Sequence, residues 1–186
     1  MITPKILVLA TGGTIAGQAG DAIRHDYRPG QLGIDEMLAK VATLGIPAQL
    51  SGKQIANIGS EDMSAAIWAA LHRETAAAMA DPECDGVIIT HGTDTVEETA
   101  FLLDLTLPTT KPVVLVGAMQ PADTQRNNNQ QNIANAMQVM RSPETAGRGE
   151  LEEMGAGAGG SGSGWHAGGA LKPSGRRPGR PRARGR

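Results

Sequence analysis

The stretch Lys5-Ile-Leu-Val-Leu-Ala10, followed directly by Thr11-Gly-Gly-Thr-Ile-Ala-Gly17, decides the fold class of this chain. A short continuous apolar run that ends in a glycine-rich turn is typical of a buried parallel strand, because helices cover both faces of such a strand. The glycines permit a tight turn that brings backbone N–H groups close to a ligand oxygen. The sequence therefore predicts a first strand over Lys5 to Ala10 and a ligand-facing loop after it.

Strands and helices alternate along the rest of the body. Further strands are expected at Ala48 to Ile58, Gly86 to Thr90 and Pro112 to Val116. Helices are expected around Ile34, Met37, Leu38 and Val41, around Met63, Ile67, Leu71 and Met79, over Val96 to Leu105, and over Asn132 to Met140. This alternation predicts an α/β fold of the Rossmann-like kind, a parallel sheet with helices on both faces.

Polar residues indicate where helices begin and where an expected strand should not form. Ser60-Glu61-Asp62 offers capping oxygens to the helix that follows, and Thr95-Val-Glu-Glu98 has the pattern of a capping box. Gly149 to Met154 occupies the place of a further buried strand but carries three carboxylates. Because a buried, unpaired carboxylate is costly, we expect no strand there.

Composition limits the function classes. At 186 residues and 40% hydrophobic content the chain can bury the core of one ordinary domain. Aromatic residues make up 2%, which argues against base stacking on nucleic acid. Cys84 has no second cysteine to pair with, fits a reducing compartment, and is expected to be a small buried hydrophobe. The apolar run near Met1 is strand-length, without a basic leader or cleavage site, so we expect a cytoplasmic protein without a membrane segment.

The C-terminal part differs in composition from the body. Ten basic and 19 acidic residues precede Lys172, a balance of −9, whereas Lys172 to Arg186 carries seven basic residues and no acidic one. We therefore divide the chain into an incomplete domain at 1–154 and a Gly/Ala/Arg/Pro-rich segment at 155–186 that we expect to be disordered. A shift of reading frame or a truncation near Arg148 would give this Gly, Ala, Arg and Pro composition. A basic tail that binds RNA is the functional alternative.

Two loops carry the chemistry, because ligands of parallel α/β sheets bind where strands end and helices begin. They are Thr11 to Gly17 and Thr90 to Thr95. Gly12 and Gly17 have the spacing of a phosphate-binding loop, so nucleotide binding stays open on this evidence alone. Gln18-Ala19, however, stands where that motif requires Lys followed by Ser or Thr.

The second loop contains hydroxyls and a carboxylate at a strand-helix junction. If Thr95 and Glu98 cap the helix, Thr93 and Asp94 are not needed for capping and have no other structural role, so we expect them to face a ligand. His91 could act as a general base, but no serine or metal ligand pairs with it in the pattern. We interpret His91 as structural.

Four segments together resemble the bacterial-type L-asparaginase family, N-terminal domain. They are Leu9-Ala-Thr-Gly-Gly-Thr-Ile-Ala-Gly17, Asn57-Ile-Gly-Ser-Glu-Asp-Met63, Ile88-Ile-Thr-His-Gly-Thr-Asp-Thr-Val-Glu-Glu-Thr-Ala100 and Lys111-Pro-Val-Val-Leu-Val-Gly-Ala-Met119. They occur in the family's order and at compatible spacing. The resemblance implies an amidohydrolase that splits ammonia from the side chain of L-asparagine, or of L-glutamine, without a metal or organic cofactor.

The resemblance also implies roles for particular residues. Thr14 would be the nucleophile, and Tyr27, on the segment Gln18 to Gly30, would close over it and assist proton transfer. Thr93 and Asp94 would belong to the family's second catalytic group, which consists of a threonine, a lysine and an aspartate. The positions that match substrate-holding residues are Ser60, Glu61, Gly92 and Asp94. Donors around Thr14 and Thr93 would stabilise the oxyanion.

The likeness weakens after Met119. Arg126-Asn-Asn-Asn-Gln-Gln-Asn-Ile133 replaces the family's usual segment, and Lys172, in Leu-Lys-Pro-Ser, lacks the neighbours of the family lysine. The family's second domain, which helps to complete the sites of a homotetramer, has no counterpart, so assembly of this chain stays open. An inactive fragment that keeps part of the amino-acid pocket is therefore the alternative to an active L-asparaginase.

Overall fold

The computed structural model describes residues 3–13, 15, 18–19, 27–28, 33–107, 111–118, 129–141, 150–155 and 172–173. Its strands are β1 (Lys5–Gly12), β2 (Gln18–Ala19), β3 (Tyr27–Arg28), β4 (Gln49–Ile58), β5 (Gly86–Thr90), β6 (Val113–Ala118), β7 (Glu150–Gly155) and β8 (Lys172–Pro173). Its helices are α1 (Ile34–Ala42), α2 (Ala65–Ala80), α3 (Val96–Thr106) and α4 (Asn129–Met140), with a 3₁₀ turn at Ser60–Asp62.

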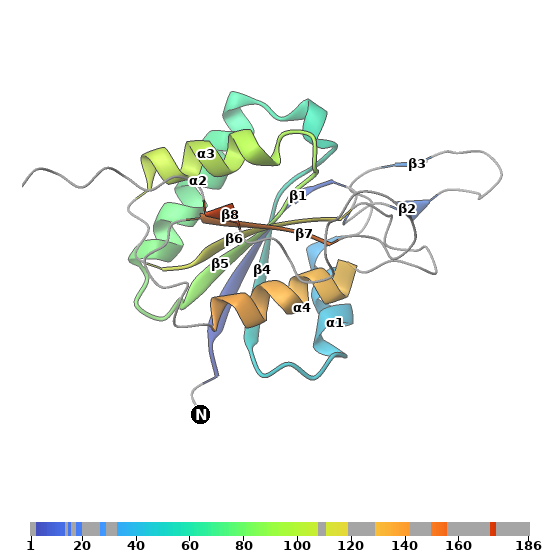
Figure 1. The fold of residues 1–186 in the computed structure, drawn as a ribbon, viewed down its shortest axis with the longest axis vertical. Coiled ribbons are helices and arrows are strands. Elements are labelled where there is room, and N and C mark those ends of the chain that lie inside the picture. Colours follow the sequence, from blue (N-terminus) through green and yellow to red (C-terminus); the bar gives the residue numbers. More distant parts are fainter. Residues whose placement is uncertain are drawn as a thin grey trace, which may run out of the picture.

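The sheet has the strand order β4-β1-β5-β6-β7-β8. The pairs from β4 to β7 are all parallel, and β8 pairs antiparallel with β7. Figure 1 shows the sheet between two helix layers, with α2 and α3 on one side and α1 and α4 on the other. The predicted α/β fold with helices on both faces is confirmed.

The apolar strands contribute side chains to the hydrophobic cores on both faces of the sheet, because successive side chains point to opposite faces. On β5, Ile88 belongs to the core under α1 and α4, whereas Val87 and Ile89 belong to the core under α2 and α3. Residues of β6 divide in the same way, and all six are buried. The continuous apolar runs of the sequence thus reflect strands that are covered on both sides.

The predicted element positions agree with the structure to within a few residues. On the inner face of α2, the residues Leu71, Thr75, Ala78 and Met79 are buried. Cys84 is buried as expected, and its thiol donates to the carbonyl oxygen of Gly86 over 3.3 Å. Phe101, the one phenylalanine of the chain, is 61% exposed on the outer face of α3 and does not contribute to the core.

Both predicted helix caps are wrong in their details. Ser60, Glu61 and Asp62 form a 3₁₀ turn of their own, and the N-cap of α2 is Ser64, whose hydroxyl accepts from the Ile67 N–H over 3.4 Å. Thr95 is the N-cap residue of α3 but makes no side-chain capping bond. Its hydroxyl instead donates to the carbonyl oxygen of Ser60.

The expectation that Gly149 to Met154 forms no strand is also wrong. Glu150–Gly155 pairs with β6 from Val113↔Glu150 to Ala118↔Gly155. The ladder uses backbone groups, which every residue of this segment supplies, and β7 has only the two-residue β8 beyond it in the sheet. Our expectation assumed full burial between strands.

The segment predicted to be disordered, 155–186, lies mostly outside the described residues. Lys172–Pro173 differs from the prediction, because it pairs with Leu151 and Glu152 of β7. Among the described residues, no helix has the length and apolar character needed to cross a bilayer.

The core under α2 and α3 yields a stability prediction. Ile89→Ala removes a side chain with no exposed surface and should lower the free energy of unfolding by about 2–5 kcal/mol. Leu105→Ala, at a residue that is 59% exposed, should change it by less than about 0.5 kcal/mol. Urea denaturation followed by circular dichroism measures both values. Equal losses would contradict the assignment of Ile89 to the core.

Candidate active site

The carboxyl ends of β1, β4 and β5 meet at one edge of the sheet, and their backbones touch there. Gly13 has φ of +74° and donates its N–H to the Ile58 carbonyl oxygen over 2.7 Å. A Cβ on Gly13 would lie 2.4 Å from the Gly92 nitrogen, and a Cβ on Gly12, with φ of +111°, would lie 2.4 Å from the Ile58 oxygen. Only glycine fits either position.

Two threonines reinforce this junction from within the strands. The Thr11 hydroxyl, which is buried, donates to the Thr90 carbonyl oxygen over 2.9 Å and so ties the end of β1 to the end of β5. The hydroxyl of Thr90 is itself buried without a hydrogen-bond partner. Thr11 therefore has a structural role, linking β1 to β5, that the glycine-rich motif alone did not reveal.

Ser60 joins the 3₁₀ turn to the loop after β5. It is 4% exposed, and its hydroxyl accepts from the Asp94 N–H over 3.0 Å and donates to Asp94 Oδ2 over 3.2 Å. Its carbonyl oxygen accepts from the Thr95 hydroxyl over 2.9 Å. A Cβ on Gly92 would lie 2.6 Å from the Ser60 hydroxyl oxygen. The structure thus brings Ser60, Gly92 and Asp94 together.

Two carboxylates lie at the surface of this junction. Asp94 is exposed beside Ser60. Glu61 is also exposed, and its carboxylate folds back over Gly59, where a Cβ would lie 2.3 Å from Glu61 Oε2. The arrangement gives negative charge to an edge of the sheet that otherwise presents hydroxyl and backbone groups, a combination suited to a small ligand with an ammonium group.

Thr93 lies between Gly92 and Asp94 and is half-buried. Among the described residues its hydroxyl has no hydrogen-bond partner, in contrast to the bonded hydroxyls of Thr95 and Ser60. The prediction that Thr93 has no structural bond is consistent with this position, but the same prediction for Asp94 is wrong, because Asp94 bonds to Ser60 through its N–H and its carboxylate.

Two of the predicted site residues stay predictions. Thr14 lies outside the described residues. Tyr27 is described by its backbone alone, in β3, where it pairs with Ala19 of β2. The structure therefore places Ser60, Glu61, Gly92, Thr93 and Asp94, and leaves the parts expected of Thr14 and Tyr27 to experiment.

His91 is fully buried beneath the loop and bonded at both ring nitrogens. Nδ1 lies 2.7 Å from the Gly92 carbonyl oxygen, and Nε2 lies 2.8 Å from the Thr99 hydroxyl. Burial lowers the pKa of His91 below its ordinary value of 6.5, because the charged form loses its hydration. A neutral imidazole that is hydrogen-bonded at both ring nitrogens fits the structural role predicted for His91.

Sequence reasoning missed Thr99 and Trp68, which complete the polar network around His91. The Trp68 indole N–H, on α2, donates to the Thr99 hydroxyl over 2.9 Å. The available signal was a hydroxyl on an apolar helix face, since Thr99 shares the buried face of α3 with Val96, Ala100 and Leu103. A buried hydroxyl needs a partner, and that requirement points to a neighbouring polar group.

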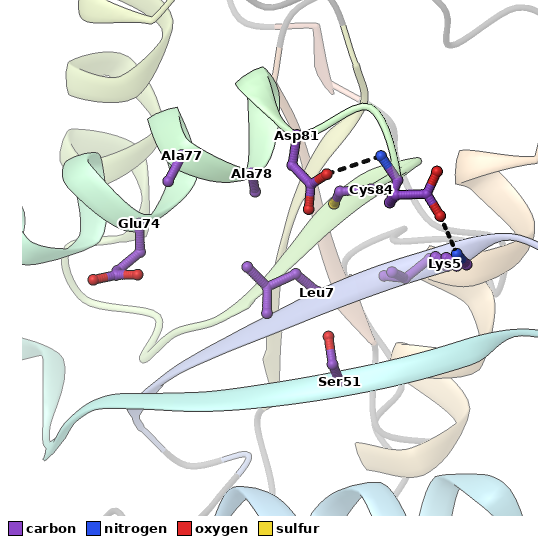
Figure 2. Close-up of a pocket in the computed structure, with 10 residues that line it drawn as sticks. Lys5, Leu7, Ser51, Glu74, Ala77, Ala78, Asp81 and Cys84 are labelled. Atoms are coloured by element: carbon purple, nitrogen blue, oxygen red, sulfur yellow. Dashed lines mark hydrogen bonds and ion pairs between the residues drawn. The ribbon is translucent and has the colours of Figure 1, made fainter.

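A pocket lies elsewhere on the described part of the chain. A hollow of about 350 Å³ opens between α2 and the first residues of β1, far along the strands from the glycine turn. Figure 2 shows Lys5 and Leu7 of β1 and Ser51 of β4 facing Ala78 and Asp81 of the α2 region. Its carboxylates are engaged: Glu83 pairs with Lys5 over 2.5 Å and Glu74 with Lys53 over 2.7 Å. This hollow contains none of the predicted site residues.

No three His, Cys, Asp or Glu side chains gather into a metal-binding cluster within the part of the chain that the structure describes. The chemistry available at the glycine junction is that of hydroxyls, carboxylates and backbone amides.

Comparison with known proteins identifies relatives of this arrangement. A family model described as "Asparaginase, N-terminal" matches residues 5–155. The probable periplasmic L-asparaginase of Haemophilus influenzae is 44% identical over 151 residues, covering 81% of this chain and 43% of the relative. L-asparaginase 2 of Escherichia coli is 42% identical over 154 residues, with the same coverage.

A solved structure gives the same result. The crystal structure of a probable cytoplasmic L-asparaginase from Campylobacter jejuni superposes with a TM-score of 0.75 at 40% identity. The match covers 81% of this chain and 46% of that chain. The chain thus spans less than half the length of the relatives it matches.

The buried imidazole predicts a pH dependence of stability. The unfolded chain takes up a proton on His91 near 6.5, whereas the folded chain does so only at lower pH. The contribution of neutral His91 to the free energy of unfolding is therefore complete above pH 6.5, and it is lost as the pH falls from there toward the lowered pKa. Between about pH 7.5 and about pH 5.5 the wild-type chain should lose more free energy of unfolding than His91→Gln.

Urea denaturation at the two pH values measures this difference. Leu105→Ala, at an exposed residue of α3 whose side chain does not titrate, is the control and should retain the wild-type pH dependence. An identical loss in wild type and His91→Gln would show that His91 is not held neutral by burial.

Proposed function

This chain belongs to the asparaginase family through its N-terminal domain, and from that premise we propose that it hydrolyses the side-chain amide of free L-asparagine to L-aspartate and ammonia. The observation that carries the proposal is the convergence of Ser60, Gly92 and Asp94 beside the Gly12-Gly13 turn. Ser60 follows β4, Gly92 and Asp94 both follow β5, and the Gly12-Gly13 turn ends β1, so three strand ends meet here. Ser60, Gly92 and Asp94 also coincide with the family positions expected to hold an amino acid.

The charges at the site fit a free amino acid. The exposed carboxylates of Asp94 and Glu61 supply negative charge for an α-ammonium group. The Ser60 hydroxyl, which is bonded to Asp94, can orient that carboxylate or meet the α-carboxylate of the substrate. A small zwitterion with a side-chain amide matches these groups.

The proposed reaction uses a threonine nucleophile. Thr14 follows Gly13 directly in the chain, and Gly13 packs on Gly92, next to Thr93. The Thr14 oxygen would bond to the amide carbon while its proton passes, with assistance from Tyr27, to the nitrogen that leaves as ammonia. Water would then hydrolyse the resulting ester, release L-aspartate and restore the hydroxyl. Backbone N–H groups of the glycine turn would stabilise the oxyanion.

The second candidate is a chain that binds the amino acid without turnover. The observation that favours it is that the family match ends at Gly155, and Lys172 does not lie in a segment resembling that of the family lysine. The two candidates agree on amino-acid binding at Ser60 and Asp94 and differ in ammonia release.

Location and assembly belong to the proposal as well. We expect a cytoplasmic protein, supported by the lone, buried Cys84, although named relatives include both a periplasmic and a cytoplasmic L-asparaginase. A homotetramer is the assembly that the family resemblance implies. Phe101 and Leu105, exposed one helical turn apart on α3, offer apolar surface for association.

Ammonia release from L-asparagine by the purified 186-residue chain tests the proposal. Thr14→Ala and Thr93→Ala should each lower kcat by about 10³-fold or more, because each removes a hydroxyl assigned to the chemistry. Thr106→Ala, at an exposed threonine whose hydroxyl bonds only to Leu102, is the matched control and should retain wild-type turnover.

L-glutamine assayed in parallel decides between the two amide substrates. Full turnover by Thr14→Ala would contradict the nucleophile assignment. Absence of turnover from a folded chain that still binds L-aspartate would contradict hydrolysis and support the second candidate.

A further inference from the structure

The Thr99 hydroxyl is the centre of a buried polar network behind the site. It is fully buried on α3 and has three polar neighbours: His91 Nε2 at 2.8 Å, the Trp68 indole nitrogen at 2.9 Å and the Thr95 carbonyl oxygen at 3.1 Å. A hydroxyl has a single proton, so these contacts cannot all be donated by Thr99.

The direction of each bond follows from the chemistry of the partners. An indole N–H only donates, so Thr99 accepts from Trp68. A carbonyl oxygen only accepts, so His91 carries its proton on Nδ1 and donates it to Gly92. The buried ring is neutral, which leaves Nε2 as an acceptor for the Thr99 proton. The Thr95 carbonyl oxygen still receives the Thr99 backbone N–H over 3.2 Å.

The network therefore runs in one direction, from Trp68 through Thr99 and His91 to the carbonyl oxygen of Gly92. It joins α2, α3 and the loop after β5. Gly92 is also the residue against which Gly13 and Ser60 pack, and its carbonyl belongs to the peptide unit that leads into Thr93. Fixing this carbonyl fixes the orientation from which the Thr93 and Asp94 side chains depart.

We propose that Thr99 is a positioning residue for the amidase reaction: by donating to His91 Nε2 it holds the tautomer that anchors the Gly92 carbonyl and so aligns Thr93 and Asp94. This inference rests on the proposed function for its catalytic consequence. Its structural consequence, a fixed His91 tautomer, holds independently of turnover.

Thr75 provides the contrast that separates positioning from ordinary burial. It too is a fully buried helical threonine, but its hydroxyl donates only to the Leu71 carbonyl oxygen one turn earlier, over 2.8 Å. Replacing either residue by valine keeps the shape of the side chain and removes the hydroxyl. Loss of packing or helix bonding would affect both variants alike.

The first readout is the imidazole itself. With ¹⁵N-labelled histidine, the nitrogen shifts of the ring should show protonated Nδ1 and hydrogen-bonded Nε2 in the wild-type chain, and His91→Gln assigns the signal among the four histidines. Thr99→Val should give a mixture of tautomers and shift the backbone amides of Thr93 and Asp94. Thr99→Ser should restore the wild-type pattern, and Thr75→Val should not alter it.

The second readout is kinetic. Thr99→Val should lower kcat about tenfold or more with little change in KM, because small misplacement of a reacting group costs rate more than affinity. Thr99→Ser should recover most of the rate, and Thr75→Val should match the wild-type chain. Unchanged kcat in Thr99→Val beside an active wild-type chain would overturn the catalytic part of the proposal.

The two readouts keep this inference separate from the proposed function. If the wild-type chain releases no ammonia, the proposed function fails, and the ring tautomer still decides whether Thr99 aligns the loop. Wild-type nitrogen shifts in Thr99→Val, or amide shifts no larger than those in Thr75→Val, would overturn the positioning role.

Discussion

The close approach of the Gly13 and Gly92 backbones is the constraint on which the site depends. No side chain fits between them, since a Cβ on Gly13 would lie 2.4 Å from the Gly92 nitrogen. This contact lets the turn after β1 rest directly on the loop after β5, while the opposite side of Gly92 rests on Ser60. The strand ends could not converge at this distance with larger residues, and the site residues would be spread along the edge of the sheet.

The hydroxyl groups near the carboxyl ends of these strands differ in their hydrogen bonding. Those of Thr11, Thr95 and Thr99 bond to the chain itself and hold the loops in place. The Thr93 hydroxyl has no partner among the described residues. Threonines that look alike in the sequence thus differ in the structure: the hydroxyls of Thr11, Thr95 and Thr99 hold the chain together, whereas those of Thr93 and Thr90 are unbonded among the described residues.

The sequence predicted the elements whose cause is local. The continuous apolar runs of β1, β5 and β6 and the spacing around Ile34 identified strands and a helix, because burial on both faces or on one face leaves a direct pattern. The family motifs also predicted Ser60, Gly92 and Asp94 as substrate-holding positions, and the structure brings these three residues together.

The failures came from contacts between distant segments. Capping by Thr95 was reasonable locally, but the Ser60 carbonyl, 35 residues away, takes its hydroxyl. The β7 strand forms because β6 supplies a backbone ladder that the glutamate-rich sequence does not reveal. Trp68 and Thr99 were missed because their bond joins two helices separated by a whole strand. Thr14 and Tyr27 stay predictions from the family motif.

The most direct measurement of the central claim is the affinity of the folded chain for L-aspartate after alanine replaces Gly13. Calorimetric titration should show a loss of tenfold or more, roughly 1.4 kcal/mol, because the new Cβ would lie 2.4 Å from the Gly92 nitrogen and push the two strand ends apart. Gly45→Ala, where φ is +66° and nothing lies within 4 Å, carries similar backbone strain without a clash and should bind like the wild-type chain. Wild-type affinity in Gly13→Ala would contradict the account, since the site would then not depend on the contact between these strand ends.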